Sequence, residues 1–191
     1  MMALAALVAG AAAVVYVHNE ASNALAAQGA ATVMAGTADQ APKALYDLNA
    51  LPDPVKRMIE AIAEAAQSGE IEKMRPVLES NELKPMIAAD HVDDPIAFWK
   101  KESADGSGRD VLAAMLNVMS AGYARVGKGQ DEIYVWPYFA ETGLSALTPA
   151  QEVELYRIVP PQLAAAMKKS GEYSYYKLGI APTGVWHYFL R

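Results

Sequence analysis

The sequence of 191 residues contains no cysteine. This absence excludes disulfide bonds, zinc sites built on thiolates, a cysteine nucleophile and a lipid-modified cysteine anchor. Histidine is scarce as well, because only three occur in the chain, and two of them, His91 and His187, lie beyond the N-terminal segment. Few side chains are therefore available for metal binding or covalent catalysis.

Clusters of positive charge are also missing. The formal net charge is −6, and no run of Lys or Arg is longer than two residues. A nucleic-acid-binding protein needs a basic stripe that neutralises phosphates, and a polybasic membrane-surface patch needs a similar cluster. The sequence therefore predicts no nucleic-acid partner, and it predicts membrane contact only through the N-terminal segment, if that segment is retained.

Charge is almost absent from residues 1–42, where Glu20 and Asp39 are the only charged side chains. An unbroken apolar run covers residues 1–17, although no basic residue precedes it, and Ala24-Leu25-Ala26 fits the small-x-small pattern of signal cleavage. We therefore predict a signal segment over residues 1–26 and export, with the periplasm as destination. Two alternatives stay open: residues 1–17 tether the protein as a retained membrane anchor, or they form a buried alanine-rich helix.

Residues 27–51 are rich in Ala, Gly, Thr and Gln and show no sustained periodicity, so they are predicted to be a flexible linker. A single domain is predicted over residues 52–191. Three helix starts in it carry a cap residue followed by proline, at Asp53-Pro54, Asp94-Pro95 and Thr148-Pro149.

A strong helix with a wide apolar face is predicted over residues 109–123. Strand composition marks three runs, residues 133–140, 173–180 and 185–190, and Pro137 is expected to place the first of them at a sheet edge or a bulge. These signals predict an α+β fold. About five or six helices pack on one face of a small, roughly three-stranded antiparallel sheet that ends in a C-terminal hairpin.

The last two runs are joined by residues 181–184, which suit a three-residue hairpin loop with a bulge and with Gly184 in the left-handed region. If Ala181 lies opposite Val185, the register pairs apolar and aromatic residues on one face: Ile180 with Trp186, Leu178 with Tyr188, and Tyr176 with Leu190. The same register places His187 on the other face, near Tyr175 and beside Gly179, where the glycine would leave open space.

Three stretches of the domain, FWKKESADGSGRDVLAAML, IYVWPYFA and YYKLGIAPTGVWHYFL, make it resemble a group of uncharacterised exported bacterial proteins. The resemblance covers roughly residues 52–191. It implies export and a single domain, and it implies no activity, because that group has none assigned.

Motifs for catalysis or metal binding are weak. His91 and Asp93 could offer metal ligands from one loop, but no HExxH-type pair accompanies them. Residues 105–110 resemble part of a calcium loop without its alternating acidic ligands and distal glutamate. Ser103 and Ser107 stand in no nucleophile motif. The sequence therefore predicts no catalytic residue, no metal site and no cofactor.

Aromatic side chains on the predicted strands are the one suggestive feature. Core packing explains most of them, but alternation along a strand leaves some on the outer face, where a Tyr/Trp platform can stack on sugars or peptides. The candidate binding residues are His187, Tyr175, Trp136 and Tyr138.

We therefore expect a non-catalytic binding or structural protein of the cell envelope, with an envelope glycan or a peptide as ligand. The alternative is a hydrolase that acts on envelope material through carboxylates or His187. Such an enzyme would need a pocket that joins His187 to an acid, with Asp90, Asp93 and Glu141 as candidates.

Overall fold

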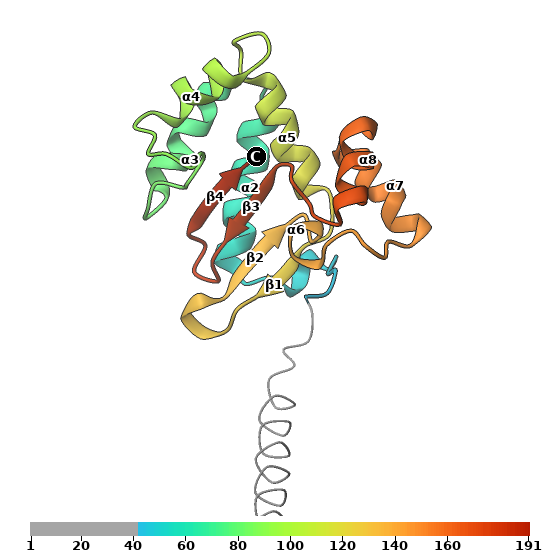
Figure 1. Cartoon of the computed structure of the whole chain (residues 1–191). Coiled ribbons are helices and arrows are strands. Elements are labelled where there is room, and N and C mark those ends of the chain that lie inside the picture. The colour runs from blue at the N-terminus through green and yellow to red at the C-terminus, as the bar shows by residue number, and fades with distance from the viewer. Residues whose placement is uncertain (1–41) are drawn as a thin grey trace, which may run out of the picture. The chain divides into compact units, whose positions relative to one another are not determined.

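A four-stranded antiparallel sheet organises the part of the chain that the structure describes, residues 42–191 of a computed structural model (Figure 1). The strand order follows the chain: β1 (Ala124–Val126), β2 (Ile133–Trp136), β3 (Lys177–Ile180) and β4 (Trp186–Leu190). β3 and β4 form the predicted closing hairpin. The predicted α+β class is therefore confirmed, with one strand more than expected.

Seven α-helices accompany the sheet within residues 42–191. They are α2 (Asp53–Gln67), α3 (Met74–Ser80), α4 (Pro95–Glu102), α5 (Arg109–Met119), α6 (Phe139–Thr142), α7 (Pro149–Ile158) and α8 (Pro161–Ser170). Three short 3-10 segments are η1 (Leu48–Ala50), η2 (Ile71–Lys73) and η3 (Gly129–Asp131). The predicted signal segment, the alternative anchor and residues 27–41 of the predicted linker lie outside the described residues. In the described part, no helix is long and apolar enough to cross a membrane.

Residues 42–51, which the sequence pattern assigns to the linker, pack on the domain. Leu45 and Tyr123 exchange two main-chain hydrogen bonds, each with an N···O distance of 2.8 Å. The Tyr123 hydroxyl donates to the carbonyl of Asp47 over 3.0 Å, and Leu51 is buried. Residues 42–51 therefore belong to the same compact unit as residues 52–191.

Proline follows the start of three helices, as the sequence predicts. Asp94 accepts hydrogen bonds from two N–H groups in the first turn of α4, and Thr148 forms a capping box with Gln151 at the start of α7. The first helix differs, because Pro52 occupies the cap position of α2 and Asp53 lies inside the first turn. A carboxylate there still interacts favourably with the positive end of the helix dipole.

The sequence pattern did not predict β1 or α6, and α6 begins inside the run 133–140 that was predicted as a strand. α5 ends at Met119 rather than near Tyr123, and β1 begins a few residues later, opposite β2. A strand of three residues is too short to show a period of two. The expected edge or bulge at Pro137 is wrong, because β2 lies between β1 and β3 and ends at Trp136, before the proline could interrupt the hydrogen-bond ladder.

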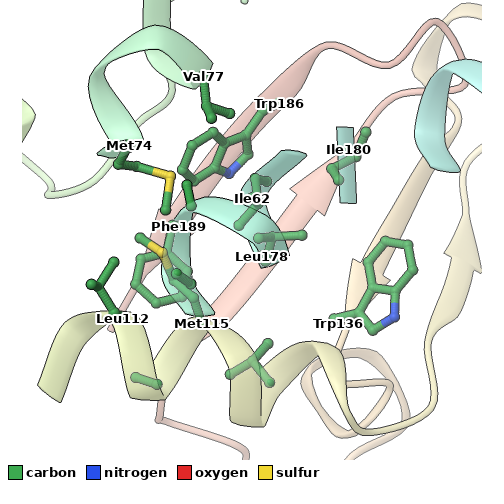
Figure 2. Close-up of a cluster of buried hydrophobic side chains, with 14 of the residues drawn as sticks. Ile62, Met74, Val77, Leu112, Met115, Trp136, Leu178, Ile180, Trp186 and Phe189 are labelled. Carbon is green, nitrogen blue, oxygen red and sulfur yellow. The ribbon is translucent and has the colours of Figure 1, made fainter. Parts of the chain in front are cut away.

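The main hydrophobic core lies between one face of the sheet and the helices α2, α3, α4 and α5 (Figures 1 and 2). The strands contribute Trp136, Leu178, Ile180, Trp186 and Phe189, all at most 1% exposed. The helices contribute, among others, Ile62, Met74, Leu112 and Met115. Full burial of one such side chain stabilises a fold by about 1.5–3 kcal/mol. A second, smaller cluster lies among α6, α7 and α8 and includes Tyr138, Phe139, Leu155 and Met167.

The predicted hairpin register is correct at the loop and wrong beyond it. The N–H of Ala181 donates to the Val185 carbonyl, Ile180 pairs with Trp186, and Gly184 has a φ of 89°. An irregularity then shifts the pairing by one residue. The observed pairs beyond it are Gly179 with Tyr188, Leu178 with Phe189, and Lys177 with Leu190.

This bulge decides which aromatic side chain enters the core. Phe189 is buried there, whereas the sequence analysis placed Tyr188 beside Leu178. Phenylalanine has no hydroxyl that would need a partner in an apolar core, so the shifted register avoids that cost. The space expected over Gly179 is filled, because a Cβ atom at residue 179 would overlap the ring of Tyr188.

The outer edge of β4 is covered by the segment that follows α3. The Asn81 side-chain amide accepts from the Trp186 N–H and donates to the Trp186 carbonyl, both over 2.8 Å. Farther along, the Met86 N–H donates to the His187 carbonyl (2.8 Å), and the Phe189 N–H donates to the Met86 carbonyl (2.9 Å). These contacts satisfy main-chain groups that an open sheet edge would leave free to pair with another chain.

Candidate binding site

A pocket of about 430 Å³ lies where α4 meets the open end of the β3–β4 hairpin. Its volume is within the range of roughly 300–1,000 Å³ that is usual for small-molecule sites. α4 and α5 contribute Phe98, Trp99, Glu102 and Val111, the hairpin contributes Tyr176, Phe189 and Arg191, and the loop before α4 contributes Ile87, Ala88 and Ala89. The pocket therefore joins two helices, a sheet end and a loop.

Aromatic side chains that pack on one another form much of its wall. The ring of Tyr176 is stacked on that of Phe189, with centroids 5.1 Å apart and an interplanar angle of 8°. Phe189 in turn meets Trp99 edge-to-face at 6.3 Å, and Trp99 stacks on Trp186. Because Trp99, Phe189 and Trp186 belong to the main core, this wall is held rigidly.

Two opposite charges complete the lining. The Arg191 guanidinium lies over the rings of both Tyr175 and Tyr176, with its central carbon 5.6 Å from each centroid. Glu102 is exposed at the end of α4. None of the ion pairs among the described residues includes either side chain. Both charges are therefore available to a ligand.

The tyrosine of the wall stays neutral at physiological pH. Burial raises the pKa of the Tyr176 hydroxyl above its ordinary value, and the nearby Arg191 cation offsets only part of this shift. A neutral phenol can donate or accept a hydrogen bond, but it supplies neither a strong base nor a ready proton. Tyr176 is thus suited to contact a ligand rather than to transfer a proton.

Another hollow of about 420 Å³ lies between the end of α3 and the start of α4. Its arginine and the carboxylate of Asp94 already pair within the protein. Arg75 lies 3.1 Å from a Glu72 oxygen and 3.7 Å from an Asp94 oxygen, and Asp94 also caps α4. We therefore regard the aromatic pocket as the better candidate site.

The four residues that the sequence analysis singled out are not brought together. Trp136 is fully buried against Tyr123, and Tyr138 is 1% exposed in the smaller cluster, where its hydroxyl donates to Glu154 over 3.2 Å. His187 is exposed on β4. Tyr175 alone lies beside the pocket, where it meets Tyr176 edge-to-face at 4.8 Å and lies under Arg191.

The hydrolase alternative requires His187 and an acid in one pocket. His187 lines neither the aromatic pocket nor the hollow at Arg75. His91 and Asp93 form a pair at 3.2 Å on the surface, with side chains 79% and 95% exposed. Among residues 42–191 no group of three or more histidines and carboxylates could hold a metal ion.

Ser103 has a structural environment. Its Oγ lies 2.5 Å from an Asp110 carboxylate oxygen and 3.1 Å from an Asp105 carboxylate oxygen, which share its single hydroxyl proton, and it accepts the N–H of Gly108. These bonds hold the loop of residues 103–108 closed before α5. A serine whose hydroxyl bonds two carboxylates in this way lacks the histidine or lysine base of the usual nucleophile arrangements.

Sequence reasoning missed most of the pocket. Phe98 and Trp99 lie in the short helix that follows the predicted start at Asp94-Pro95, where nothing in the pattern marks a cavity, and Arg191 is one of many isolated charges. The pocket also depends on the bulge in β4, which carries Phe189 rather than Tyr188 to the core face. The aromatic richness of the last strand was the only signal that pointed toward this end of the hairpin.

Comparisons with protein-family models, with curated proteins and with solved structures found no match. The resemblance to exported bacterial proteins therefore stays a prediction.

Proposed function

We propose that this chain is an exported, non-catalytic binding protein of the cell envelope whose ligand occupies the aromatic pocket at Trp99, Tyr176 and Arg191. The observation that carries the proposal is the lining of that pocket. Rigid aromatic side chains stand beside a guanidinium and a carboxylate that have no ion-pair partner among the described residues. An apolar cavity with a few convergent polar groups is the usual form of a ligand site.

The same lining favours binding over hydrolysis. Hydrolysis by carboxylates commonly uses two of them, and hydrolysis by a nucleophile uses a hydroxyl or thiol with an adjacent base. The pocket offers one carboxylate, Glu102, together with a neutral phenol and a guanidinium that stays protonated. These groups can recognise a ligand by charge and hydrogen bonding.

The export part of the proposal rests on residues 1–26. Intact-mass measurement on the natively expressed protein tests it. We expect a mature chain that lacks about the first 26 residues and is recovered from the periplasmic fraction. A full-length species in the membrane fraction would favour a tether at residues 1–17, and a full-length soluble species in the cytoplasm would contradict export.

The binding part is tested by filling the pocket. Ala89 lines it and is exposed, so Ala89→Trp should add bulk to the cavity without overpacking the core. Ala113→Trp on the exposed face of α5 is the matched control, since Ala113 does not line the pocket. Both variants are compared with the wild type by calorimetric titration with N-acetyl-phenylalanine, its amide and N,N′-diacetylchitobiose.

We expect at least one of these probes to bind the wild type and the Ala113→Trp variant equally well. Its affinity for the Ala89→Trp variant should fall by about tenfold or more, because the tryptophan ring occupies the space of the probe. Equal affinity for all three proteins, or no binding of any probe to the wild type, would contradict a ligand site in this pocket.

A further inference from the structure

We infer that the pocket recognises a peptide by an apolar side chain and the free carboxylate next to it, that is, by a C-terminal residue. This inference rests on the proposed function and specifies its ligand. The carboxylate would pair with Arg191, the apolar side chain would lie against Trp99 and Phe98, and an amide N–H of the peptide would donate to Glu102.

The case for a carboxylate comes from Arg191. Its guanidinium is held over two tyrosine rings, so little side-chain freedom remains to be lost when it binds. No ion pair within residues 42–191 uses it, although the domain contains many carboxylates. A planar guanidinium accepts a carboxylate through two parallel hydrogen bonds, and such bonds are about twice as strong as those between neutral groups.

The arrangement of the aromatic rings favours a peptide over a stacked sugar. A sugar ring needs an open aromatic face. One face of Tyr176 is covered by Phe189, and Arg191 lies over the same ring. Trp99 is 3% exposed and stacks on Trp186. The Tyr176 and Trp99 rings therefore leave little open face for a sugar, and Phe98 with the aliphatic groups of the lining suits an apolar side chain.

The carboxylate of Glu102 suits the same ligand. A peptide that ends in a free carboxylate carries an amide N–H close to that group, and a carboxylate is a strong acceptor for it. Glu102 comes from α4 and Arg191 directly follows β4, so the ligand would bridge the two elements. Ile87, Ala88 and Ala89 add an apolar wall, and the two alanines leave room for the bound residue.

The test compares two probes that differ only in charge. N-acetyl-phenylalanine carries the free carboxylate, and N-acetyl-phenylalanine amide carries a neutral amide in its place. We expect the acid to bind the wild type at least about tenfold more tightly than the amide, the contribution expected of a charge-assisted hydrogen-bonded pair. Arg191→Gln should bring the two affinities to within about twofold, with the loss confined to the acid.

Two further variants control for charge and folding. Arg57→Gln removes the same charge from the exposed side of α2, where Arg57 lines no part of the pocket, and it should keep the preference for the acid. Arg191→Lys keeps the charge but loses the planar fork, so its preference should be intermediate. Unfolding midpoints that agree among the variants would show that the affinities compare folded proteins.

The outcomes separate this inference from the proposed function. If the acid and the amide bind equally and Ala89→Trp weakens both, the carboxylate inference is wrong and the ligand site stands. Tighter binding of N,N′-diacetylchitobiose than of the acid, abolished by Ala89→Trp, would replace the peptide with a glycan. If Ala89→Trp changes no affinity, the proposed function fails together with the inference.

Discussion

The two ends of the β3–β4 hairpin have the same strands and opposite surroundings. At the loop end Ile180 and Trp186 are fully buried, and the Asn81 side chain completes the hydrogen bonds of the strand edge. At the open end Tyr176 is half-buried, and Arg191 is exposed above it with no carboxylate partner among the described residues. The contrast indicates that the loop end stabilises the fold and that the open end is available for binding.

The largest expected difference concerns Trp186. Trp186→Ala should lower the free energy of unfolding by about 3–5 kcal/mol, because it removes a fully buried ring and leaves a cavity between β4 and Trp99. Arg191→Gln at the other end should change it by less than about 0.5 kcal/mol, as for other surface substitutions. Urea unfolding measures both. If both variants lost a similar amount of unfolding free energy, the two ends of the hairpin would not differ in their contribution to stability.

The next largest effect concerns the strand edge at the loop end. Asn81→Ala removes both hydrogen bonds to the main chain of Trp186, so we expect the free energy of unfolding to fall by about 1–3 kcal/mol. Asn117→Ala is the control, since Asn117 is exposed on α5 and its side chain makes no hydrogen bond within the described residues. The control should be nearly neutral. A neutral Asn81→Ala variant would mean that water replaces the amide without cost.

A smaller effect is expected in the middle of the hairpin, at Gly179. A methyl group there would overlap the ring of Tyr188, which is half-buried and can tilt away, so Gly179→Ala should cost about 1 kcal/mol. Adding Tyr188→Ala should remove most of that cost. A double-mutant cycle in urea measures the coupling between the two residues. Additive costs would show that the ring does not limit the space above the glycine.

The smallest expected effect is on the pH dependence of stability, which should come from carboxylates at the starts of α4 and α5 and not from the hairpin. The N–H groups of Ala97 and Ile96 hold the pKa of Asp94 below its ordinary value. Burial raises the pKa of Asp110, but hydrogen bonds from Ser103 and its neighbours outweigh burial, so this pKa is also lowered. Such carboxylates stabilise the fold above their unfolded pKa of about 3.9, and the contribution is lost as the pH falls through the folded-state value.

The free energy of unfolding of the wild type should therefore fall as the pH drops below about 4, which we call the acid limb of its pH profile. For Asp110→Asn the free energy of unfolding, measured in urea at successive pH values, should fall less steeply over this range. Arg191→Gln should leave that limb unchanged, because Arg191 pairs with no carboxylate among the described residues. An acid limb that is identical in the wild type and Asp110→Asn would contradict the lowered pKa of Asp110.

Local signals predicted the fold class and most of the helices. The caps at Asp94 and Thr148 act within one turn, and the loop that ends in Gly184 fixes the pairing of its nearest neighbours. The bulge that follows could not be predicted locally, because it depends on which side chain packs beside Trp99 in the core. Trp99 and Phe189 are far apart in the sequence. β1 was missed for a similar reason, since its three residues are defined by β2.

The candidate site was harder to predict than the fold. Aromatic composition pointed to the strands, but composition does not tell a buried ring from one that lines a cavity, and Trp136 and Tyr138 proved to be buried. The pocket combines α4, α5, β4 and a loop that are adjacent only in the folded protein. Arg191 has no feature in the sequence that distinguishes it from other surface charges.

The most direct test of the account follows the three tryptophan indole N–H signals in a ¹⁵N-labelled sample during titration with N-acetyl-phenylalanine. Trp99 lines the pocket, whereas Trp136 lies in the core away from its lining. We predict that the Trp99 signal shifts and saturates, that the Trp136 signal stays in place, and that Ala89→Trp abolishes the Trp99 shift. A Trp99 signal that does not move at saturating concentrations of the probe, or a Trp136 signal that moves as far, would contradict a ligand site at the open end of the hairpin.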